Sequence, residues 1–325
     1  MATRSAADSA DGRVVLGGAG GFMGAYLTER YRRAGREVLT IGRGGADLEW
    51  EDERGLAEAV DGAALLIGLA GKSVDCRYHA ANRAEIVRSR LATTTALSRA
   101  VSSAIAPPPL WVNSSTATIY RHAEDRPMTE STGEIGRGFS VEVAKAWEEA
   151  LFTEELPATR RVALRSAIVL GHGGALGPIR TLTRLGLGGA QYDGWWPVTR
   201  SRLQAGTVHR RGSGGGRQRF SWIHIEDVAR IIDFAEDHPE LAGPVNASAP
   251  NPVDNRTFMS AVRRTLGTPF GLPAPRWMLE LGAIAIRTET ELVLKSRWVL
   301  PEKLERAGFE FSYAELAPAL REALA

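Results

Sequence analysis

Arg13-Val-Val-Leu-Gly-Gly-Ala-Gly-Gly-Phe-Met-Gly24 is the stretch that decides the fold class of this chain. Its apolar run ends in glycines at Gly18, Gly21 and Gly24, and an amphipathic helix pattern follows. A dinucleotide-binding unit has this order: the first glycine permits a tight turn, the second admits a pyrophosphate, and the third lets the helix pack closely. The N–H groups at the start of that helix attract phosphate. We therefore expect a nucleotide-binding turn, against the alternative of a purely structural glycine turn.

Composition places the chain among soluble globular proteins. Hydrophobic residues make up 44% and charged residues 24% of its 325 residues, which is ordinary for that class. A net charge of +2 is too small to indicate a nucleic-acid partner. No apolar stretch reaches the ~18–20 residues that span a bilayer, so we expect no membrane association. Cys76 is the only cysteine, which excludes an internal disulfide and is consistent with a reducing compartment. Because residues 1–11 also lack the apolar core of a signal peptide, we expect a cytoplasmic protein.

Strand-like apolar runs alternate with helical patterns along most of the chain. Helices are predicted at 79–105 and 140–156, and Asp227 is the expected N-cap of a further helix. Continuous apolar strands that alternate with helices indicate a parallel sheet covered on both faces. The fold class we expect is therefore α/β, a Rossmann fold with a doubly wound parallel sheet. The strands after the glycine turn are predicted at 37–43, 64–71, 110–115, 161–170 and 244–249.

The domain organisation follows from a change of texture after Leu170, where the chain becomes rich in Gly and Arg. Residues 1–11 are small and polar, and we expect them to be disordered. Residues 12–170 plus 221–250 are assigned to the dinucleotide-binding domain. Residues 171–220 plus 251–325 are assigned to a smaller C-terminal substrate lobe.

The end of the second strand bears on the choice of cofactor. An acidic residue there would bind the ribose 2′-hydroxyl of NAD, whereas an arginine suits the 2′-phosphate of NADP. Here that strand ends in Gly42-Arg43, and the competing acids Asp47 and Asp52 lie beyond it. We therefore expect NADP(H) in preference to NAD(H). The alternative is that Arg43 is only a solvated surface residue.

Several further motifs occur in order along the chain and together resemble one family. The chain is similar to the extended short-chain dehydrogenases/reductases, and within them to the atypical "epimerase family" branch whose C-terminal segment is a domain of unknown function. The resemblance covers almost everything from Arg13 onward. It rests on the glycine turn and on Leu69-Ala-Gly71, Ser89-Arg90, Trp147-Glu148, Gly186-Leu-Gly-Gly189, Gly216-Arg-Gln218, Ser221-Trp-Ile-His224 and 299–311.

The resemblance implies an NADPH site with contacts that can be carried over by position. The glycine turn would bind the pyrophosphate, Gly42 with Arg43 the 2′-phosphate, and Val169 would lie near the nicotinamide. Leu69 and Val169 have the alternative of being plain core residues, and Glu85 with Arg90 of being a surface pair. The implied cofactor contacts are Gly18, Gly21, Phe22, Met23, Gly24, Gly42, Arg43, Leu69, Ala70, Glu85, Arg90 and Val169.

The catalytic residues of that superfamily are only partly matched. Short-chain dehydrogenases usually place a Tyr four residues before a Lys on one helix, and the Tyr transfers the proton. Here Val141 stands four residues before Lys145, so the pair is absent. In Ser114-Ser-Thr-Ala-Thr-Ile-Tyr120, Thr116 takes the place of the family's serine and would polarise a substrate carbonyl. Tyr120 is a candidate proton donor, with the alternative of being a core residue.

A departure from the family lies between Gly189 and Gly212, where about twenty residues are extra relative to common members. This insertion contains Tyr192, Trp195, Trp196 and His209. It would fall in the substrate lobe, as a cap over the active site, a surface loop or an oligomer contact. In the glycine-rich loop that follows, Arg217 and Gln218 are candidate substrate contacts. His224 is expected to fix a helix start instead of doing chemistry.

These observations lead to one functional hypothesis and one rival. We expect an NADP(H)-binding oxidoreductase or epimerase that acts on a small polar substrate by hydride transfer, with no metal. The rival is a catalytically weak or inactive NADPH sensor or interaction module, which the missing Tyr-Lys pair favours. Related folds often pair through two helices, so a homodimer is the expected assembly.

Overall fold

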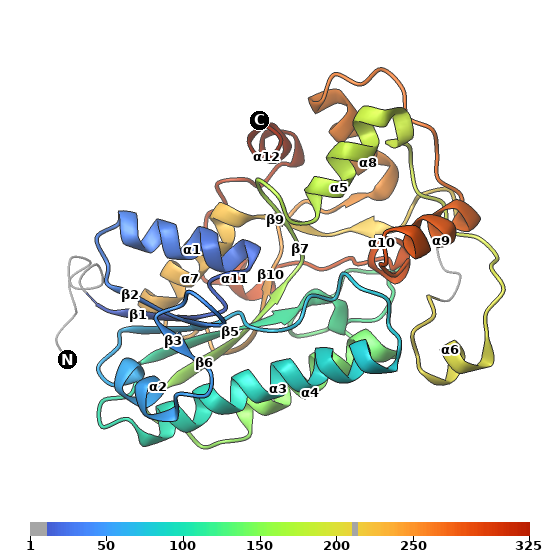
Figure 1. Ribbon diagram of the computed structural model, residues 1–325. Coiled ribbons are helices and arrows are strands. Elements are labelled where there is room, and N and C mark those ends of the chain that lie inside the picture. The colour runs from blue at the N-terminus through green and yellow to red at the C-terminus, as the bar shows by residue number, and fades with distance from the viewer. Residues whose placement is uncertain (1–11, 210–213) are drawn as a thin grey trace.

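A seven-stranded parallel sheet forms the centre of the structure, a computed structural model that describes residues 12–209 and 214–325 (Figure 1). Every pair of neighbouring strands is parallel, in the order β10-β6-β5-β4-β1-β2-β3. The expected Rossmann fold is therefore confirmed, while the segment 1–11 lies outside the described residues. The strands are β1 (Val14–Gly17), β2 (Val38–Gly42), β3 (Leu48–Glu49), β4 (Leu65–Gly68), β5 (Leu110–Thr116), β6 (Arg160–Ser166) and β10 (Gly243–Ala247).

Helices cover both faces of this sheet (Figure 1). One face carries α1 (Phe22–Arg33), α7 (Ile225–Asp237) and α11 (Glu302–Arg306), and the other carries α2 (Glu53–Val60), α3 (Ala80–Ser103) and α4 (Phe139–Phe152). Successive strand residues point to opposite faces, so Val14 and Leu16 belong to the first core whereas Val15 belongs to the second. This explains why the strands are apolar without alternation.

A smaller lobe is built on two short two-stranded sheets at one end of the main sheet. The expected strand 161–170 is split, because β6 stays in the main sheet while β7 (Ile168–Leu170) pairs with β9 (Trp222–His224). The second pair is β8 (Arg219–Phe220) with β11 (Val253–Asp254). The lobe's helices are α5 (Leu176–Leu182), α6 (Arg200–Gln204), α8 (Asn255–Thr265), α9 (Arg276–Ala285), α10 (Glu291–Leu294) and α12 (Leu316–Ala323).

Two sequence-based assignments differ from the structure. The N-cap of α7 is His224, whose Nδ1 accepts from the N–H of Glu226, whereas Asp227 lies in the first turn. The Asp227 carboxylate instead accepts the N–H groups of Ser312 and Tyr313. The assignment of all of 251–325 to the smaller lobe is too broad, because α11 contacts β10, and Leu304 is buried in the Rossmann core.

None of the helices in the described parts of the chain is long and apolar enough to cross a membrane. The same residues contain no cluster of three or more His, Cys, Asp or Glu side chains that could hold a metal ion.

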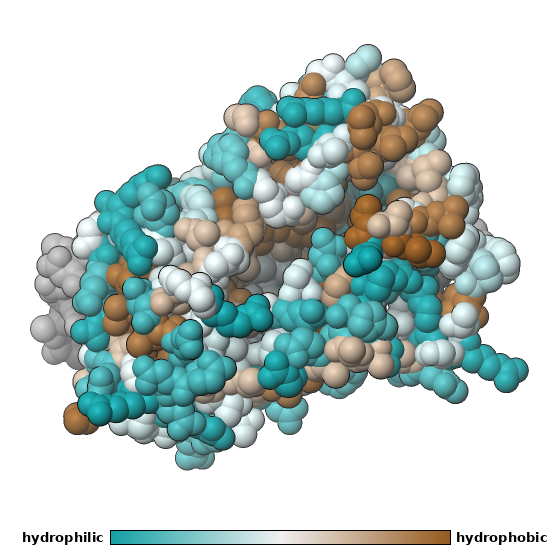
Figure 2. Space-filling model, in the orientation of Figure 1, coloured by the Kyte–Doolittle hydropathy of each residue, from teal (hydrophilic) through white to brown (hydrophobic). Residues whose placement is uncertain are grey.

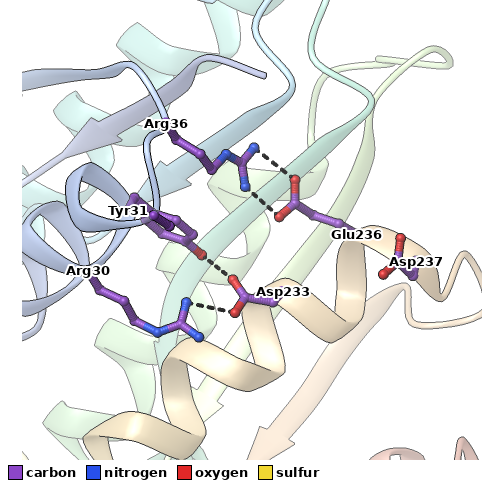
Figure 3. A pocket seen from close by; sticks show the side chains of 7 residues that line it. Arg30, Tyr31, Arg36, Asp233, Glu236 and Asp237 are labelled. Carbon is purple, nitrogen blue, oxygen red and sulfur yellow. Dashed lines mark hydrogen bonds and ion pairs between the residues drawn. The ribbon is translucent and has the colours of Figure 1, made fainter. Parts of the chain in front are cut away.

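The contact between α1 and α7 is polar and partly buried (Figure 3). Two Arg36 nitrogens donate to the two Glu236 carboxylate oxygens, at 2.8 and 3.0 Å. The Tyr31 hydroxyl donates to Asp233, which also pairs with Arg30 at 2.7 Å. These residues line a surface pocket at the C-terminal end of α1, the end away from the glycine turn. The pocket is therefore part of the helix packing and lies apart from the carboxyl ends of the strands, where ligands bind in this fold.

Loss of the Arg36 guanidinium should destabilise the protein because it leaves a buried carboxylate without its partner. The Arg36 and Glu236 side chains are only 5% and 13% exposed, and removing one partner of such a pair costs about 3 kcal/mol. We expect Arg36→Met to lower the free energy of unfolding by this amount in urea titrations. The matched control is Arg54→Met, whose exposed i,i+4 pair with Glu58 contributes little. Equal losses in the two variants would contradict the prediction.

Candidate functional site

The glycine turn lies where the strand order reverses. β1 and β4 are neighbours whose chains continue to opposite sides of the sheet, and ligands bind at this reversal in doubly wound sheets. Gly18 follows β1 with a φ of +93°, a left-handed conformation that favours glycine. A Cβ at Gly18 would lie 2.9 Å from the backbone N of Ala70, which follows β4. The two strand ends therefore meet backbone to backbone.

The start of α1 is seated against this turn. A Cβ at Gly24 would lie 2.2 Å from the carbonyl oxygen of Gly18, so only glycine lets the first helical turn approach so closely. Gly21 is the N-cap, and no side chain caps the helix. A Cβ on Gly21 would come no closer than 3.5 Å to the protein. The helix N-terminus thus keeps free N–H groups and steric room, which is what a phosphate requires.

Phe22 forms a wall beside the helix start. Its ring faces the loop after β7, where Cβ atoms added to Gly171 and Gly174 would lie within 3.0 Å of it. The glycines of this loop therefore leave room for the aromatic ring. Met23 is partly buried and packs on the main core, as do Leu69 after β4 and Val169 in β7. Leu69 and Val169 are hence the core residues that the alternative describes, and Leu69 follows the end of β4 whereas Val169 is the middle residue of β7.

The end of β2 offers a positive charge, and the two acids expected to compete with it are bound by other residues. Arg43 follows Gly42, is exposed, and makes no hydrogen bond or ion pair with the described residues. Asp47 accepts from the N–H and hydroxyl of Thr40, at 2.8 and 2.7 Å, and these bonds hold the pKa of its carboxyl below the usual value. Asp52 caps α2 by accepting from the N–H of Gly55. Both acids are therefore used by the local fold.

The two α3 positions differ from each other in the structure. Glu85 pairs with Arg88 on the helix surface, and the hydrogen bonds from Arg88, followed by the charges of Arg88, Lys72 and Arg43, lower the pKa of its carboxyl. Arg90 is buried over the Trp147 ring, at 4.7 Å, and donates to the carbonyl of Lys72 at 2.9 Å. Burial lowers the Arg90 pKa to about 10. Glu85 and Arg90 are thus not a surface pair, and Arg90 fixes the loop after β4.

Thr116 lies at the carboxyl end of β5, where it begins the short helix Ala117–Ile119. Its hydroxyl accepts from the N–H of Thr118 at 3.1 Å. Lys295 donates to the carbonyl of Thr118 at 2.7 Å, and burial lowers the Lys295 pKa to about 8. Lys295 was not among the residues predicted from the sequence. Lys295 could have been singled out in the sequence, because it is one of only four lysines and follows the apolar run Leu292-Val-Leu294.

Tyr120 occupies the core position that was its alternative. Its hydroxyl donates to Asn246 Oδ1 at 2.9 Å and accepts from Arg165 Nη1 at 2.9 Å. Arg165 forms a two-point ion pair with Glu148. Burial raises the Tyr120 pKa, and the side chain is only 1% exposed. This placement argues against Tyr120 as a proton donor. Lys145 pairs with Glu142 on the surface and supplies no replacement.

The two candidate substrate contacts, Arg217 and Gln218, differ in their exposure to solvent. Arg217 is exposed, whereas Gln218 is buried and donates to the carbonyl of Gln191 at 2.9 Å. The backbone carbonyl oxygen of Gln218 accepts from the N–H of Asn255 at 3.0 Å. Gln218 therefore ties the start of the insertion to α8, while its Oε1 is buried without a hydrogen-bond partner among the described residues.

The insertion is held against the C-terminal helices. Asp193 binds Arg276 of α9 at 2.9 Å and His209 at 2.9 Å, and Arg202 of α6 binds Glu289 at 2.7 Å. Trp195 is 78% exposed. The described part of the insertion, up to residue 209, is thus a surface segment anchored by buried charges, and no pattern in the sequence indicates these pairs. The remaining residues of the insertion lie outside the described ranges.

Comparisons with known proteins agree with this geometry. Residues 14–147 match the NAD dependent epimerase/dehydratase family, and residues 274–323 match a domain of unknown function, DUF1731. The epimerase family protein SDR39U1 of Bos taurus is 33% identical over 96% of this chain and all of its own length. The epimerase family protein YfhF of Bacillus subtilis is 29% identical over 96% of this chain and 98% of its own.

A solved structure shares the whole architecture. The crystal structure of human epimerase family protein SDR39U1 with NADPH superimposes with a TM-score of 0.80 and 28% identity, covering 96% of this chain and 98% of that one. The resemblance inferred from the motifs is thereby confirmed. The chain belongs to the NAD-dependent epimerase/dehydratase family within the short-chain dehydrogenase/reductase fold, in the branch of epimerase family proteins that carry the DUF1731 domain.

Proposed function

We propose that this protein binds NADPH at the β1–β4 reversal and acts as an oxidoreductase or epimerase on a carbonyl or hydroxyl substrate. The observation that carries the proposal is the glycine turn, which combines close backbone packing at Gly18 and Gly24 with open space at Gly21. The human relative was solved with NADPH, which supports the same cofactor here. Cys76 as the only cysteine supports a cytoplasmic location.

The residues present fit NADPH better than NADH. Arg43 is exposed and is one of three basic residues, with Arg88 and Lys72, whose charges lower the pKa of the Glu85 carboxyl. A guanidinium at this place can bind a 2′-phosphate through two charge-assisted hydrogen bonds. The acids that could bind a ribose 2′-hydroxyl are Asp47 and Asp52, and both already have backbone partners.

The proposed chemistry is a reversible hydride transfer. NADPH, when bound, supplies the hydride that reduces a substrate carbonyl carbon, and a proton must reach the carbonyl oxygen to give the alcohol. Thr116 at the end of β5 would orient that oxygen. Lys295 and Arg297 act through Thr118, since one donates to its carbonyl and the other to its hydroxyl. They are positioning residues, because they hold the turn that follows Thr116.

A sensor without catalysis is the second candidate, and one observation favours it. The usual proton-transfer pair is missing, and Tyr120 is bound within the core. In that case NADPH would bind while no carbonyl compound is reduced. Turnover assays across ketone, aldehyde and nucleotide-sugar panels, run beside calorimetric NADPH titrations, distinguish a sensor from an enzyme.

Two glycine substitutions should separate folding from cofactor binding. Gly24→Ala places a methyl group 2.2 Å from the Gly18 carbonyl oxygen, so we expect a lower melting temperature. Gly21→Ala has room within the protein but intrudes where a pyrophosphate would approach. We expect it to keep the wild-type melting temperature and to lose NADPH affinity at least tenfold, as measured by calorimetry. Undiminished NADPH affinity in Gly21→Ala would place the phosphates elsewhere.

Arg43→Ala should remove the preference for NADPH. The lost charge-assisted bonds are expected to weaken NADPH binding about tenfold or more and to leave NADH binding unchanged. Parallel calorimetric titrations of both cofactors measure the ratio. The control is Arg54→Ala, because Arg54 is also an exposed arginine but lies on α2 and pairs with Glu58. A loss of affinity for both cofactors alike would show that Arg43 does not bind the 2′-phosphate.

Thr116→Val should lower kcat while leaving NADPH affinity intact, because the hydroxyl that orients the substrate oxygen is lost and the side-chain volume is kept. Thr116→Ser keeps the hydroxyl and should retain most of the activity. The measurement is steady-state reduction of the best carbonyl substrate found in the panel, with the NADPH Kd determined for each variant. Equal activity of the Val and Ser variants would exclude a role for this hydroxyl.

A further inference from the structure

The end of β5 presents two threonines to solvent. Within 110–120, only Thr116 and Thr118 are half-buried, and every other residue is buried. The two lie on either side of Ala117, where the strand passes into the short helix Ala117–Ile119. Core packing thus closes the end of β5 except at these two residues, and both of them carry a hydroxyl.

Both threonine hydroxyls accept a hydrogen bond and have a proton left to donate. The N–H of Thr118 donates to Thr116 Oγ1 at 3.1 Å, and Arg297 Nε donates to Thr118 Oγ1 at 3.1 Å. A hydroxyl has one O–H donor besides the lone pairs with which it accepts. In the parts of the chain that the structure describes, neither hydroxyl donates to an acceptor. A ligand at this place would therefore meet two donors.

Two buried cations stand behind the pair of threonines. Lys295 Nζ donates to the carbonyl of Thr118 at 2.7 Å, and Arg297 donates to the hydroxyl of the same residue. The other hydrogen bonds of Arg297 also go to uncharged oxygens, the backbone carbonyls of Leu292 and Glu291. An ammonium has three donors, of which Lys295 uses one among the described residues. Both cations are only 7% exposed.

The charge of this cluster is not balanced within the described residues. The carboxylate of Glu291 acts on both cations, but its hydrogen bond comes from the Ser140 hydroxyl at 3.0 Å. Burial lowers the pKa of Lys295 to about 8, and the charge of Glu291 offsets only part of this shift. Two cations with one carboxylate leave an excess of positive charge. Buried charges are normally paired, so the cluster is suited to an anionic ligand.

The sheet register relates the threonines to the glycine turn. Gly17, Gly68 and Asn113 are aligned across β1, β4 and β5, and β5 continues for three more residues to Thr116. Three strand residues extend about 10 Å. Thr116 therefore lies on the same edge of the sheet as the glycine turn and further along the strand direction. Figure 2 shows the molecule hollowed near the centre of this view, where the smaller lobe meets the Rossmann domain.

We infer that Thr116 and Thr118 together bind a 2-oxo acid, with the substrate carbonyl oxygen on the Thr116 hydroxyl and the substrate carboxylate on the Thr118 hydroxyl. This inference rests on the proposed function and names the substrate class of the same site. The carboxylate is assigned to Thr118 because this residue has both cationic contacts, whereas Thr116 accepts only a backbone N–H. We call the two hydroxyls with Lys295 and Arg297 the anion site.

The reaction at the anion site is a reduction of the 2-oxo acid to a 2-hydroxy acid. A hydride from NADPH is added to the carbonyl carbon, and a proton from solvent is added to the carbonyl oxygen, which leaves NADP⁺. Negative charge develops on that oxygen as the hydride arrives. The Thr116 hydroxyl stabilises this charge by donating to the oxygen. Lys295 and Arg297 act through Thr118 and are positioning residues.

The test compares 2-oxo acids of about three to six carbons with their uncharged primary amides. Calorimetry with the protein loaded with NADP⁺ measures binding without turnover. Each acid should bind about tenfold more tightly than its amide, because only the acid brings the anion that the cluster lacks and hydrogen bonds to charged groups are the stronger ones. Equal affinity for acid and amide, or no binding of any acid in the series, would overturn the inference.

Variants of the anion site test which residues produce the preference. Thr118→Val removes the hydroxyl and should bring the ratio of acid to amide affinity close to one, whereas Thr118→Ser should retain the ratio. Lys295→Met should lower the same ratio and leave the NADPH Kd unchanged. This variant removes a buried charge, so it keeps the test decisive even where Thr118→Val fails to fold. A purely structural role would weaken acid and amide alike, and that outcome would overturn the inference.

The matched control is Thr153→Val at the C-terminal end of α4. The Thr153 hydroxyl donates to the carbonyl of Glu149 at 2.7 Å, and the residue is exposed. This variant should keep the wild-type ratio of acid to amide affinity. A loss of the ratio here equal to that in Thr118→Val would show that the preference does not come from the anion site.

Separate readouts keep this inference apart from the proposed function. Binding that prefers acids, without NADPH oxidation, would uphold the anion site and refute hydride transfer. Reduction of 2-oxo acids and neutral ketones with equal kcat/KM would uphold hydride transfer and refute the anion site.

Discussion

The close approach between Gly24 and Gly18 is the constraint on which the rest of the structure depends. The first turn of α1 lies against the backbone of the turn after β1, where an added Cβ would be 2.2 Å from a carbonyl oxygen. This contact sets the direction of α1 back across the sheet, and it leaves the helix N-terminus open at the β1–β4 reversal. Because all seven strands are parallel, their carboxyl ends meet at this same edge. Thr116 and Ala70 are brought there by the same topology.

The parts that could be predicted from the sequence are those with local causes. The glycine turn needs backbone conformations and clearances that only glycine supplies, and strands buried on both faces must be apolar throughout. It could also be predicted in part that the nearby acids do not pair with Arg43, because Asp47 and Asp52 lie beyond the strand end. The structure adds that Thr40 and Gly55 bind these two acids.

The side-chain placements that were not predicted from the sequence depend on residues far away in the chain. Tyr120 is drawn into the core by Asn246 and Arg165, and Gln218 by the carbonyl of Gln191. No residue near Tyr120 in the sequence indicates that these residues are its partners. The same reason explains Asp227, whose short side chain suits an N-cap but whose carboxylate is taken by two backbone N–H groups of the C-terminal segment.

Helix α9 shows the limit of pattern reading most clearly. Periodicity identifies an amphipathic helix and cannot say which face is turned inward, since the usual answer assumes that the apolar face is buried. In this chain Asp193, which lies 83 positions before its partner Arg276, and Arg202 of the same insertion hold the two charged residues of α9 inward.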